Sequence, residues 1–379
     1  MFKRILPFLS LFFLFLLPTY CTVITQILPS EGAVGNVIRI IGDGFGAKQG
    51  KVIFSPNQEA VILHWDNNKI TVAVPLGAST GKVSVVTPRG ELAECFFSVC
   101  PSWSIYPAPI ATSLVSISLP ASNVGWAVES SGKTGLLRFN GDKWENVVLP
   151  NLTSMSDVFF LTPQNGWIVG DRGSIFHYQN GRWIDESGIT SSKLNAVHFL
   201  TPKFGWAVGE GGVIIHYYDW TAYKVEWRLV DSPTRATLYG IYCINPKLAW
   251  AVGEDGTILK FSKDRWTVLP SPTGDNLRDI SFSKPTDGWI VGHRGTIMHW
   301  NGFNWQLVYT QYSFNLYGVK AVSPEDAWAV GEKGLILHFN GVNWSASESP
   351  TTNTLYTVDF SEPKDGWVAG EEGTLLRYH

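Results

Sequence analysis

The sequence GWIVGHRGTIMHWNGFNW, residues 288–305, contains two strand-length pieces, GWIVG and GTIMHW, and reaches a third strand at Trp305. The piece LRDISF precedes it at residues 277–282, with the breaker Lys284-Pro285 between them. Asn301-Gly302 lies between the pieces at 295–300 and 305–308, and this dipeptide is typical of a tight β-hairpin. The segment therefore predicts four short antiparallel strands.

Trp289 and Trp305 belong to two series of tryptophans that repeat along the chain. The first series is Trp126, Trp167, Trp206, Trp250, Trp289, Trp328 and Trp367, and the second is Trp103, Trp144, Trp183, Trp227, Trp266, Trp305 and Trp344. The interval between Trp103 and Trp126 recurs unchanged in all seven pairs of the two series. Four strands per repeat, with a period of about 40 residues, are typical of a β-propeller. We therefore predict a seven-bladed β-propeller over residues 101–379.

The two ends of this region predict how the ring closes. The last repeat stops at His379 after its third strand, whereas Trp103 lies in a fourth-strand sequence that has no blade of its own. We predict that residues 102–107 complete blade seven by pairing with residues 373–378. Such closure would remove an exposed sheet edge.

Residues 1–21 have the features of a signal peptide. The basic residues Lys3 and Arg4 precede an apolar run over 5–18, which is shorter than the roughly 20 residues of a membrane-spanning helix. Thr19 and Cys21 provide small residues for cleavage after Cys21, and a lipoprotein anchored through Cys21 is the alternative. We expect the protein to be secreted or at the cell surface, with no transmembrane segment once the signal is removed.

Residues 22–100 form a separate module in the sequence. Alternating apolar strands separated by turn signals predict a β-sandwich of about 80 residues. The module resembles the IPT/TIG immunoglobulin-like family through Ile27-Leu28-Pro29, Gly42-Asp43-Gly44-Phe45-Gly46, Trp65-Asp66, Val74-Pro75 and Thr80-Gly81. The resemblance implies a spacer or binding module without catalytic residues. Cys95 and Cys100 are too far apart on one extended strand to form a disulfide.

The repeats resemble the BNR/Asp-box propellers and, within them, the photosystem II assembly-factor-like group. The resemblance rests on the Trp-Ala-Val-Gly-Glu-x-Gly-x-Ile core and on the Asn-Gly-x-x-Trp turn, and it extends over the whole repeat region, 102–379. Sialidases share the Asp-box but also need an arginine triad and a Tyr/Glu pair. Arginines are few and scattered here, so no sialidase site is expected.

Composition and repeat pattern limit the classes of function. Charged residues make up 16% of the chain and the net charge is −3, so no electrostatic surface for nucleic acid is expected. The third strand of every repeat carries a basic residue, and we interpret this ring as structural because metal ligands must converge on one point. These basic residues are Arg138, His177, His216, Lys260, His299, His338 and Arg377. We expect no metal, no cofactor and a monomer.

Candidate binding residues lie where the repeats differ. On the first strand of each repeat, the positions 11, 10 and 8 before the tryptophan vary, and innermost strands line the channel of a propeller. The predicted binding residues at the channel mouth are Tyr239, Arg278, Tyr317, Tyr356, Asp279, Lys320 and Asp359. Three tyrosines and an arginine are residues that binding surfaces favour. The residue that follows Val-Gly, or Ala-Gly in the last repeat, in the turn between the second and third strands is His293 in one repeat and acidic in the others. It predicts an acidic rim of Asp171, Glu210, Glu254, Glu332 and Glu371.

Three functions are compatible with this pattern. The leading hypothesis is an exported, non-catalytic recognition protein, since the sequence contains no nucleophile–base motif. Its propeller would bind a protein or glycan, and the front module would act as spacer or anchor. The first alternative is a glycoside hydrolase or lyase, which would use carboxylates such as Asp157, Asp279 and Asp359. The second alternative, suggested by resemblance alone, is an assembly factor for a membrane complex.

Overall fold

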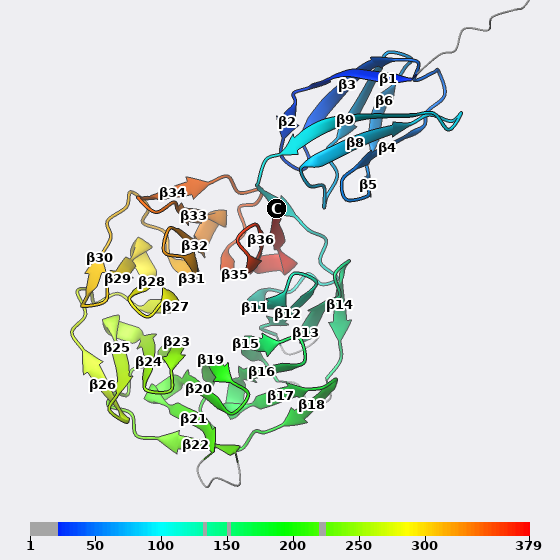
Figure 1. Cartoon of the computed structure of the whole chain (residues 1–379). Coiled ribbons are helices and arrows are strands. Elements are labelled where there is room, and N and C mark those ends of the chain that lie inside the picture. The colour runs from blue at the N-terminus through cyan, green and yellow to red at the C-terminus, as the bar shows by residue number, and fades with distance from the viewer. Residues whose placement is uncertain (1–21, 132–134, 150–152, 220–224) are drawn as a thin grey trace, which may run out of the picture. The chain divides into compact units, whose positions relative to one another are not determined.

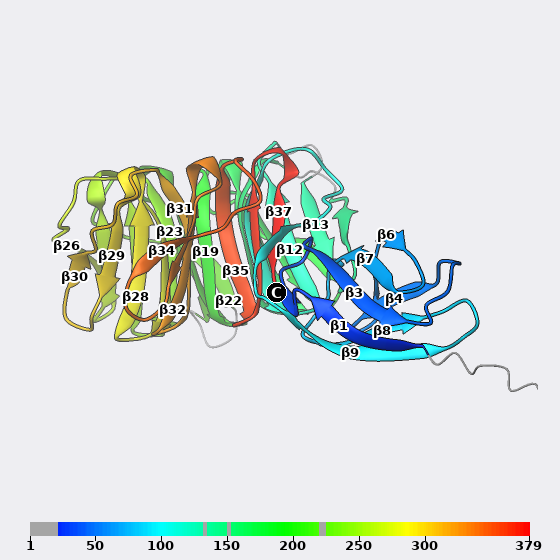
Figure 2. The same ribbon diagram turned by 90° about the horizontal axis from the view of Figure 1, so that it is seen from above.

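The computed structural model describes residues 22–131, 135–149, 153–219 and 225–379. The chain forms two compact units, one ending at Cys100 and the other running from Pro101 to His379. Figure 1 shows the ring of the second unit, and Figure 2 shows the same ring seen edge-on. No helix among the described residues is long and apolar enough to cross a membrane. The predicted signal peptide lies outside the described residues.

The first unit is a sandwich of two sheets. One sheet has the order β1 (Val23–Leu28), β3 (Val37–Asp43), β7 (Lys69–Ala73), β6 (Ile62–Trp65). The other has the order β2 (Glu31–Gly32), β9 (Leu92–Val99), β8 (Gly81–Val86), β4 (Lys51–Phe54), β5 (Gln58–Glu59). Alternate residues of these strands meet between the sheets, where Phe54 and Phe97 pack edge-to-face with ring centroids 5.6 Å apart. The predicted immunoglobulin-like sandwich is therefore confirmed, and Cys95 and Cys100 are not bridged.

The second unit consists, in its described residues, of seven four-stranded antiparallel sheets arranged in a ring. The innermost strands are β11 (Leu114–Ala121), β15 (Met155–Thr162), β19 (Leu194–Thr201), β23 (Leu238–Asn245), β27 (Leu277–Lys284), β31 (Leu316–Ser323) and β35 (Leu355–Glu362). The second strands are β12 (Val124–Glu129), β16 (Asn165–Gly170), β20 (Phe204–Gly209), β24 (Leu248–Gly253), β28 (Asp287–Gly292), β32 (Asp326–Gly331) and β36 (Asp365–Gly370). The predicted seven-bladed propeller is thus confirmed.

Third and fourth strands complete each blade toward the outside of the ring. The third strands are β13 (Leu136–Phe139), β17 (Ile175–Gln179), β21 (Ile214–Asp219), β25 (Ile258–Ser262), β29 (Ile297–Trp300), β33 (Ile336–Phe339) and β37 (Leu375–Tyr378). The fourth strands are β14 (Trp144–Val147), β18 (Arg182–Asp185), β22 (Val225–Val230), β26 (Arg265–Leu269), β30 (Trp305–Leu307), β34 (Trp344–Ser347) and β10 (Trp103–Ile105). Short 3₁₀ turns join second to third strands, namely η1 (Asp171–Gly173), η2 (Glu210–Gly212), η3 (Glu254–Gly256), η4 (His293–Gly295), η5 (Glu332–Gly334) and η6 (Glu371–Gly373). We call the side of the ring with these turns the mouth face.

Strand β10 closes the ring, as the sequence predicts. Trp103 pairs with Tyr378 and Ile105 pairs with Leu376, so the first strand of the unit becomes the fourth strand of blade seven. Backbone hydrogen bonds from Ser102 N–H to His379 O (3.1 Å) and from Tyr106 N–H to Leu375 O (2.8 Å) continue this pairing at both ends. The sheet edge of β37 is therefore covered.

The two tryptophan series meet at the boundaries between blades. A fourth-strand tryptophan packs edge-on against the second-strand tryptophan of the preceding blade, with ring centroids 5.0–5.5 Å apart. The pairs are Trp103–Trp328, Trp144–Trp367, Trp183–Trp126, Trp266–Trp206, Trp305–Trp250 and Trp344–Trp289. Edge-to-face geometry is favoured by the charge distribution of aromatic rings. The repeated tryptophans therefore hold neighbouring blades together.

The ring of basic residues on the third strands is structural. The side chain stacks on the second-strand tryptophan of its own blade, as His177 does on Trp167 with ring centroids 4.3 Å apart. In blades five, six and seven it also bonds an aspartate at the start of the second strand, as His299 does to Asp287 at 2.7 Å. The basic side chains are thus spread along seven separate blades.

Candidate functional site

A β-bulge near the start of each innermost strand places one side chain at the mouth of the channel. The strand pairing skips one residue there in every blade, so that residue is left without a partner in the ladder. A bulge turns side chains locally and re-aims them. The seven bulge residues are Val115, Ser156, Asn195, Tyr239, Arg278, Tyr317 and Tyr356.

All seven bulge residues line one pocket of about 630 Å³, which we call the channel-mouth pocket. Its wall differs between the two halves of the ring. Blades four to seven contribute Tyr239, Arg278, Tyr317 and Tyr356, whereas blades one to three contribute mainly small polar residues. The pocket therefore has one aromatic half and one half without aromatic side chains, in which serine is the commonest residue.

The three bulge tyrosines are paired with glutamates of the mouth face. Tyr239 donates its hydroxyl hydrogen to Glu254 at 3.0 Å, and Tyr356 donates to Glu371 at 3.1 Å. The hydrogen bond from the Thr237 N–H, with help from the Tyr239 hydroxyl, lowers the pKa of Glu254, and Thr354 N–H and Tyr356 do the same for Glu371. Both carboxylates therefore stay ionised at neutral pH.

The third pair, Tyr317 and Glu332, has the same geometry. The Tyr317 hydroxyl donates to Glu332 at 3.2 Å, and the Asn315 side-chain amide donates to the same carboxylate at 2.7 Å. The Tyr317 ring packs against the Tyr356 ring, with centroids 5.4 Å apart and an interplanar angle of 61°. These contacts fix two adjacent aromatic rings on the pocket wall.

Arg278 replaces the tyrosine in blade five, and His293 replaces the glutamate. The Arg278 guanidinium carbon lies 4.1 Å from the Tyr239 ring centroid and 5.6 Å from that of Tyr317. A cation above an aromatic face is attracted by the ring quadrupole. Among the described residues, no carboxylate forms an ion pair with Arg278, so aromatic rings are its main support.

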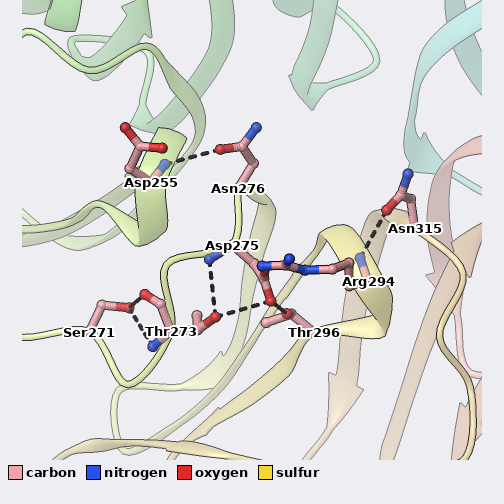
Figure 3. A network of polar contacts seen from close by, with 8 residues as sticks. All are labelled: Asp255, Ser271, Thr273, Asp275, Asn276, Arg294, Thr296 and Asn315. Carbon is pink, nitrogen blue, oxygen red and sulfur yellow. Dashed lines mark hydrogen bonds and ion pairs between the residues drawn. The ribbon is translucent and has the colours of Figure 1, made fainter.

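The turns of the mouth face are tied to the next blade by asparagines (Figure 3). The N–H of Asp255 donates to Asn276 at 3.0 Å, and the N–H of Arg294 donates to Asn315 at 2.9 Å. Both donors have positive φ, 53° and 55°, so their N–H groups point out of the turn. Asp275 adds hydrogen bonds from Thr273 and Thr296 and an ion pair with Arg294. The rim of the pocket in blades four to six is therefore firmly positioned.

Asp157 and Asp279 connect neighbouring blades inside the channel. Asp157 accepts the N–H of Val197 in blade three at 2.8 Å, and Asp279 accepts the N–H of Val319 in blade six at 2.8 Å. Burial raises the pKa of Asp157 to about 7 and that of Asp279 to about 6, although these hydrogen bonds oppose the shift. Each carboxylate uses its second oxygen for the N–H of the following residue in its own strand.

Lys320 and Asp359 do not line the channel-mouth pocket. They lie farther along the innermost strands, where they form an ion pair of 2.6 Å, and Asp359 also accepts the N–H of Leu119 in blade one at 2.7 Å. Nearby, burial lowers the pKa of His198 to about 3, so the imidazole is neutral and accepts the N–H of Cys243. These side chains occupy the third of the variable positions on the innermost strands, and they join blades rather than face a ligand at the mouth.

The predicted acidic rim is present on the mouth face but is only partly solvated. Glu254, Glu332 and Glu371 are half-buried and hydrogen-bonded, and Asp171 lies 3.3 Å from Lys193. Glu210 is exposed on the pocket wall. Sequence reasoning missed the pairing between rim and bulge residues. The signal was the joint occurrence of Tyr and Glu in blades four, six and seven and the joint loss of both in blade five.

Comparisons with known proteins agree with this architecture. The IPT/TIG domain model matches residues 22–98, and the model of the photosynthesis system II assembly factor YCF48 matches residues 260–345. A curated cyclomaltodextrin glucanotransferase of Bacillus sp. (strain 1-1) is 38% identical over 71 residues. That match covers 18% of this chain and 10% of the enzyme, so the chain spans about a tenth of the relative's length.

Solved structures resemble the propeller. A structure described as YCF48 bound to D1 peptide has a TM-score of 0.60 at 20% identity and covers 73% of this chain and 94% of that one. YCF48 from Cyanidioschyzon merolae has a TM-score of 0.60 at 18% identity, covering 73% and 99%. The WD40 β-propeller domain of Doa1 has a TM-score of 0.62 at 11% identity, covering 74% and 97%. Residues 22–98 thus match the IPT/TIG domain model, and the seven-bladed propeller that follows is similar in fold to YCF48, whose family model matches residues 260–345.

Proposed function

We propose that this protein is a non-catalytic recognition protein that acts outside the cytoplasm and binds a segment of another protein in the channel-mouth pocket. The observation that supports it most is the pocket wall, because every blade contributes its bulge residue there and these residues differ from blade to blade. Residues that differ from blade to blade are not required for the packing that all blades share, so they are available for binding. Tyrosine and arginine are also enriched where binding energy concentrates.

A protein ligand has support from the size of the pocket and from one structural relative. A volume of about 630 Å³ is in the range of small-ligand sites and could hold several side chains of a peptide, but not a folded domain. The YCF48 structure at 20% identity was solved with a D1 peptide. In this proposal the IPT/TIG domain acts as spacer or anchor, and the propeller supplies the recognition surface.

A glycoside hydrolase is less well supported by the same residues. Asp157 and Asp279 lie on the pocket wall, but each accepts N–H groups with both oxygens. A catalytic acid and base must instead be free to exchange protons with substrate or water. An assembly factor would be a special case of this recognition protein, in which the bound partner is a component of a membrane complex.

The proposal is tested by partner capture from cell-envelope extract with residues 22–379 as bait. The test variant is Tyr317→Ala with Tyr356→Ala, and the matched aromatic control is Phe303→Ser, because Phe303 is 91% exposed in the hairpin between β29 and β30. We expect wild type and control to retain the same proteins and the test variant to lose them. If all three proteins retain the same partners, the binding site lies elsewhere. If the protein captures no partner but binds to a glycan array, the ligand is a glycan and not a protein.

A second experiment tests the location. N-terminal sequencing of the protein purified from its native cells is expected to begin at or near Thr22, after removal of the predicted signal peptide. A protein that keeps Met1 in the cytoplasmic fraction would contradict export.

A further inference from the structure

The aromatic half of the pocket borders blade one, whose described residues there carry short side chains. The Tyr317 ring is flanked by Arg278 on one side and by Tyr356 on the other, with a Tyr317–Tyr356 centroid distance of 5.4 Å. Beyond Tyr356, blade one contributes Ser113, Val115 and Ser130 to the wall. These side chains are short, so no described residue of blade one reaches over the Tyr356 end of the aromatic wall.

Arg278 shows which kind of group this wall accommodates. Its guanidinium lies over the Tyr239 ring at 4.1 Å, and Tyr239 is hydrogen-bonded to Glu254. Tyr317 and Tyr356 repeat the same unit, a tyrosine with its hydroxyl on a glutamate, at 3.2 and 3.1 Å. A tyrosine that donates to a carboxylate is richer in electrons, and its face attracts a cation more strongly. The Tyr356–Glu371 unit has this geometry next to the short side chains that blade one contributes to the wall.

The charge of the pocket wall agrees with a cationic ligand. Glu210, Glu254, Glu332 and Glu371 lie on or beside the wall, and the pKa values of Glu254 and Glu371 are lowered, so they remain charged. Of the basic residues on the wall, Lys193 lies 3.3 Å from Asp171, and Arg278 is already stacked between tyrosines. Among the described residues, negative charge is therefore in excess around the rings, and it would attract a positively charged group.

We propose that the channel-mouth pocket takes a lysine or arginine side chain of the partner segment, seated against Tyr356 and Tyr317 beside the carboxylates of Glu371 and Glu332. This inference rests on the proposed function and specifies the chemistry of the ligand. Arg278 then competes with the ligand for the aromatic wall and repels it, rather than forming part of the contact.

The experiment measures binding of fluorescein-labelled Gly-Ser peptides by anisotropy at low salt. The peptides differ only in their central residues, which are arginine, glutamate or glutamine. The test variants are Glu332→Gln with Glu371→Gln, and Arg278→Gln. Glutamine keeps an oxygen that accepts the N–H groups of Asn315 and Thr354, so the first variant removes charge without removing these hydrogen bonds. Glu145→Gln on strand β14, whose carboxylate pairs with exposed Lys143, is the matched control.

We expect the arginine peptide to bind best, with binding about tenfold weaker in the glutamate double variant. Arg278→Gln should bind the arginine peptide more tightly, Glu145→Gln should bind it as wild type does, and added salt should weaken binding. Preference for the glutamate peptide, with loss of binding in Arg278→Gln, would overturn this inference but leave the proposed function intact. Failure of all peptides, together with unchanged partner capture by the Tyr317/Tyr356 variant, would overturn both.

Discussion

Replacing Trp103 by alanine is expected to destabilise the propeller by about 4 kcal/mol. The Trp103 side chain is 5% exposed and contacts three aromatic rings, those of Trp328 (5.4 Å), Phe360 (5.9 Å) and Tyr378 (5.1 Å). Truncation of a buried tryptophan commonly costs about 3–5 kcal/mol, and the tight packing on three sides limits how far the neighbours can collapse into the space. For a domain of this size, the loss corresponds to a decrease in melting temperature on the order of 10 °C.

The measurement is urea unfolding followed by tryptophan fluorescence, supported by calorimetry. Trp305→Ala is the internal comparison, because Trp305 holds the equivalent position in blade five and is 7% exposed. The two losses should be similar if β10 is a true fourth strand. Deletion of residues 102–107 should have a larger effect, and the uncovered edge of β37 should cause concentration-dependent association. A deletion variant with the wild-type melting temperature would refute the closure of blade seven.

Three further predictions concern single positions. In Gly288→Ala, the added Cβ would lie 2.4 Å from the Phe282 ring, so the free energy of unfolding in urea should fall by about 1–3 kcal/mol; an unchanged value would refute this packing. Asp157 has a folded pKa of about 7 against an ordinary 3.8, so its contribution to stability decreases as pH rises from about 4 to about 7, and Asp157→Asn should reduce that slope in pH-dependent unfolding. Burial and the bond to Glu371 raise the pKa of Tyr356 to about 12, and NMR titration of labelled tyrosine should show a lower pKa in Glu371→Gln; an unchanged titration would mean that the pair does not form.

The fold was predictable because its main contacts are repeated. The same tryptophans recur in every blade, since six of the seven boundaries contain the same edge-on pair and each pair restricts the sequence in the same way. The residue directly before the second-strand tryptophan is restricted in a similar way. It is Ala instead of Gly only in blades where the facing residue of the first strand is small, as Ala249 faces Cys243. The regular spacing of the tryptophans was therefore enough to predict the number of strands, the number of blades and the place where the ring closes.

The candidate site was only partly predictable because its contacts cross between blades. The variable positions of the innermost strands suggested the channel, and Tyr239, Arg278, Tyr317, Tyr356 and Asp279 do lie on the pocket wall. Lys320 and Asp359 vary for another reason, which is that they pair with each other and with a neighbouring blade. Their partners belong to other blades and are distant in the chain, and variation alone does not separate a ligand contact from such an inter-blade bond.

Photo-crosslinking from the pocket tests the central claim most directly. A benzophenone amino acid is placed at Tyr356 in one variant and at Phe303, outside the pocket, in another. With the partner captured from envelope extract, position 356 is expected to crosslink to it and position 303 is not. A crosslink from position 303 without one from position 356 would contradict binding at the channel mouth.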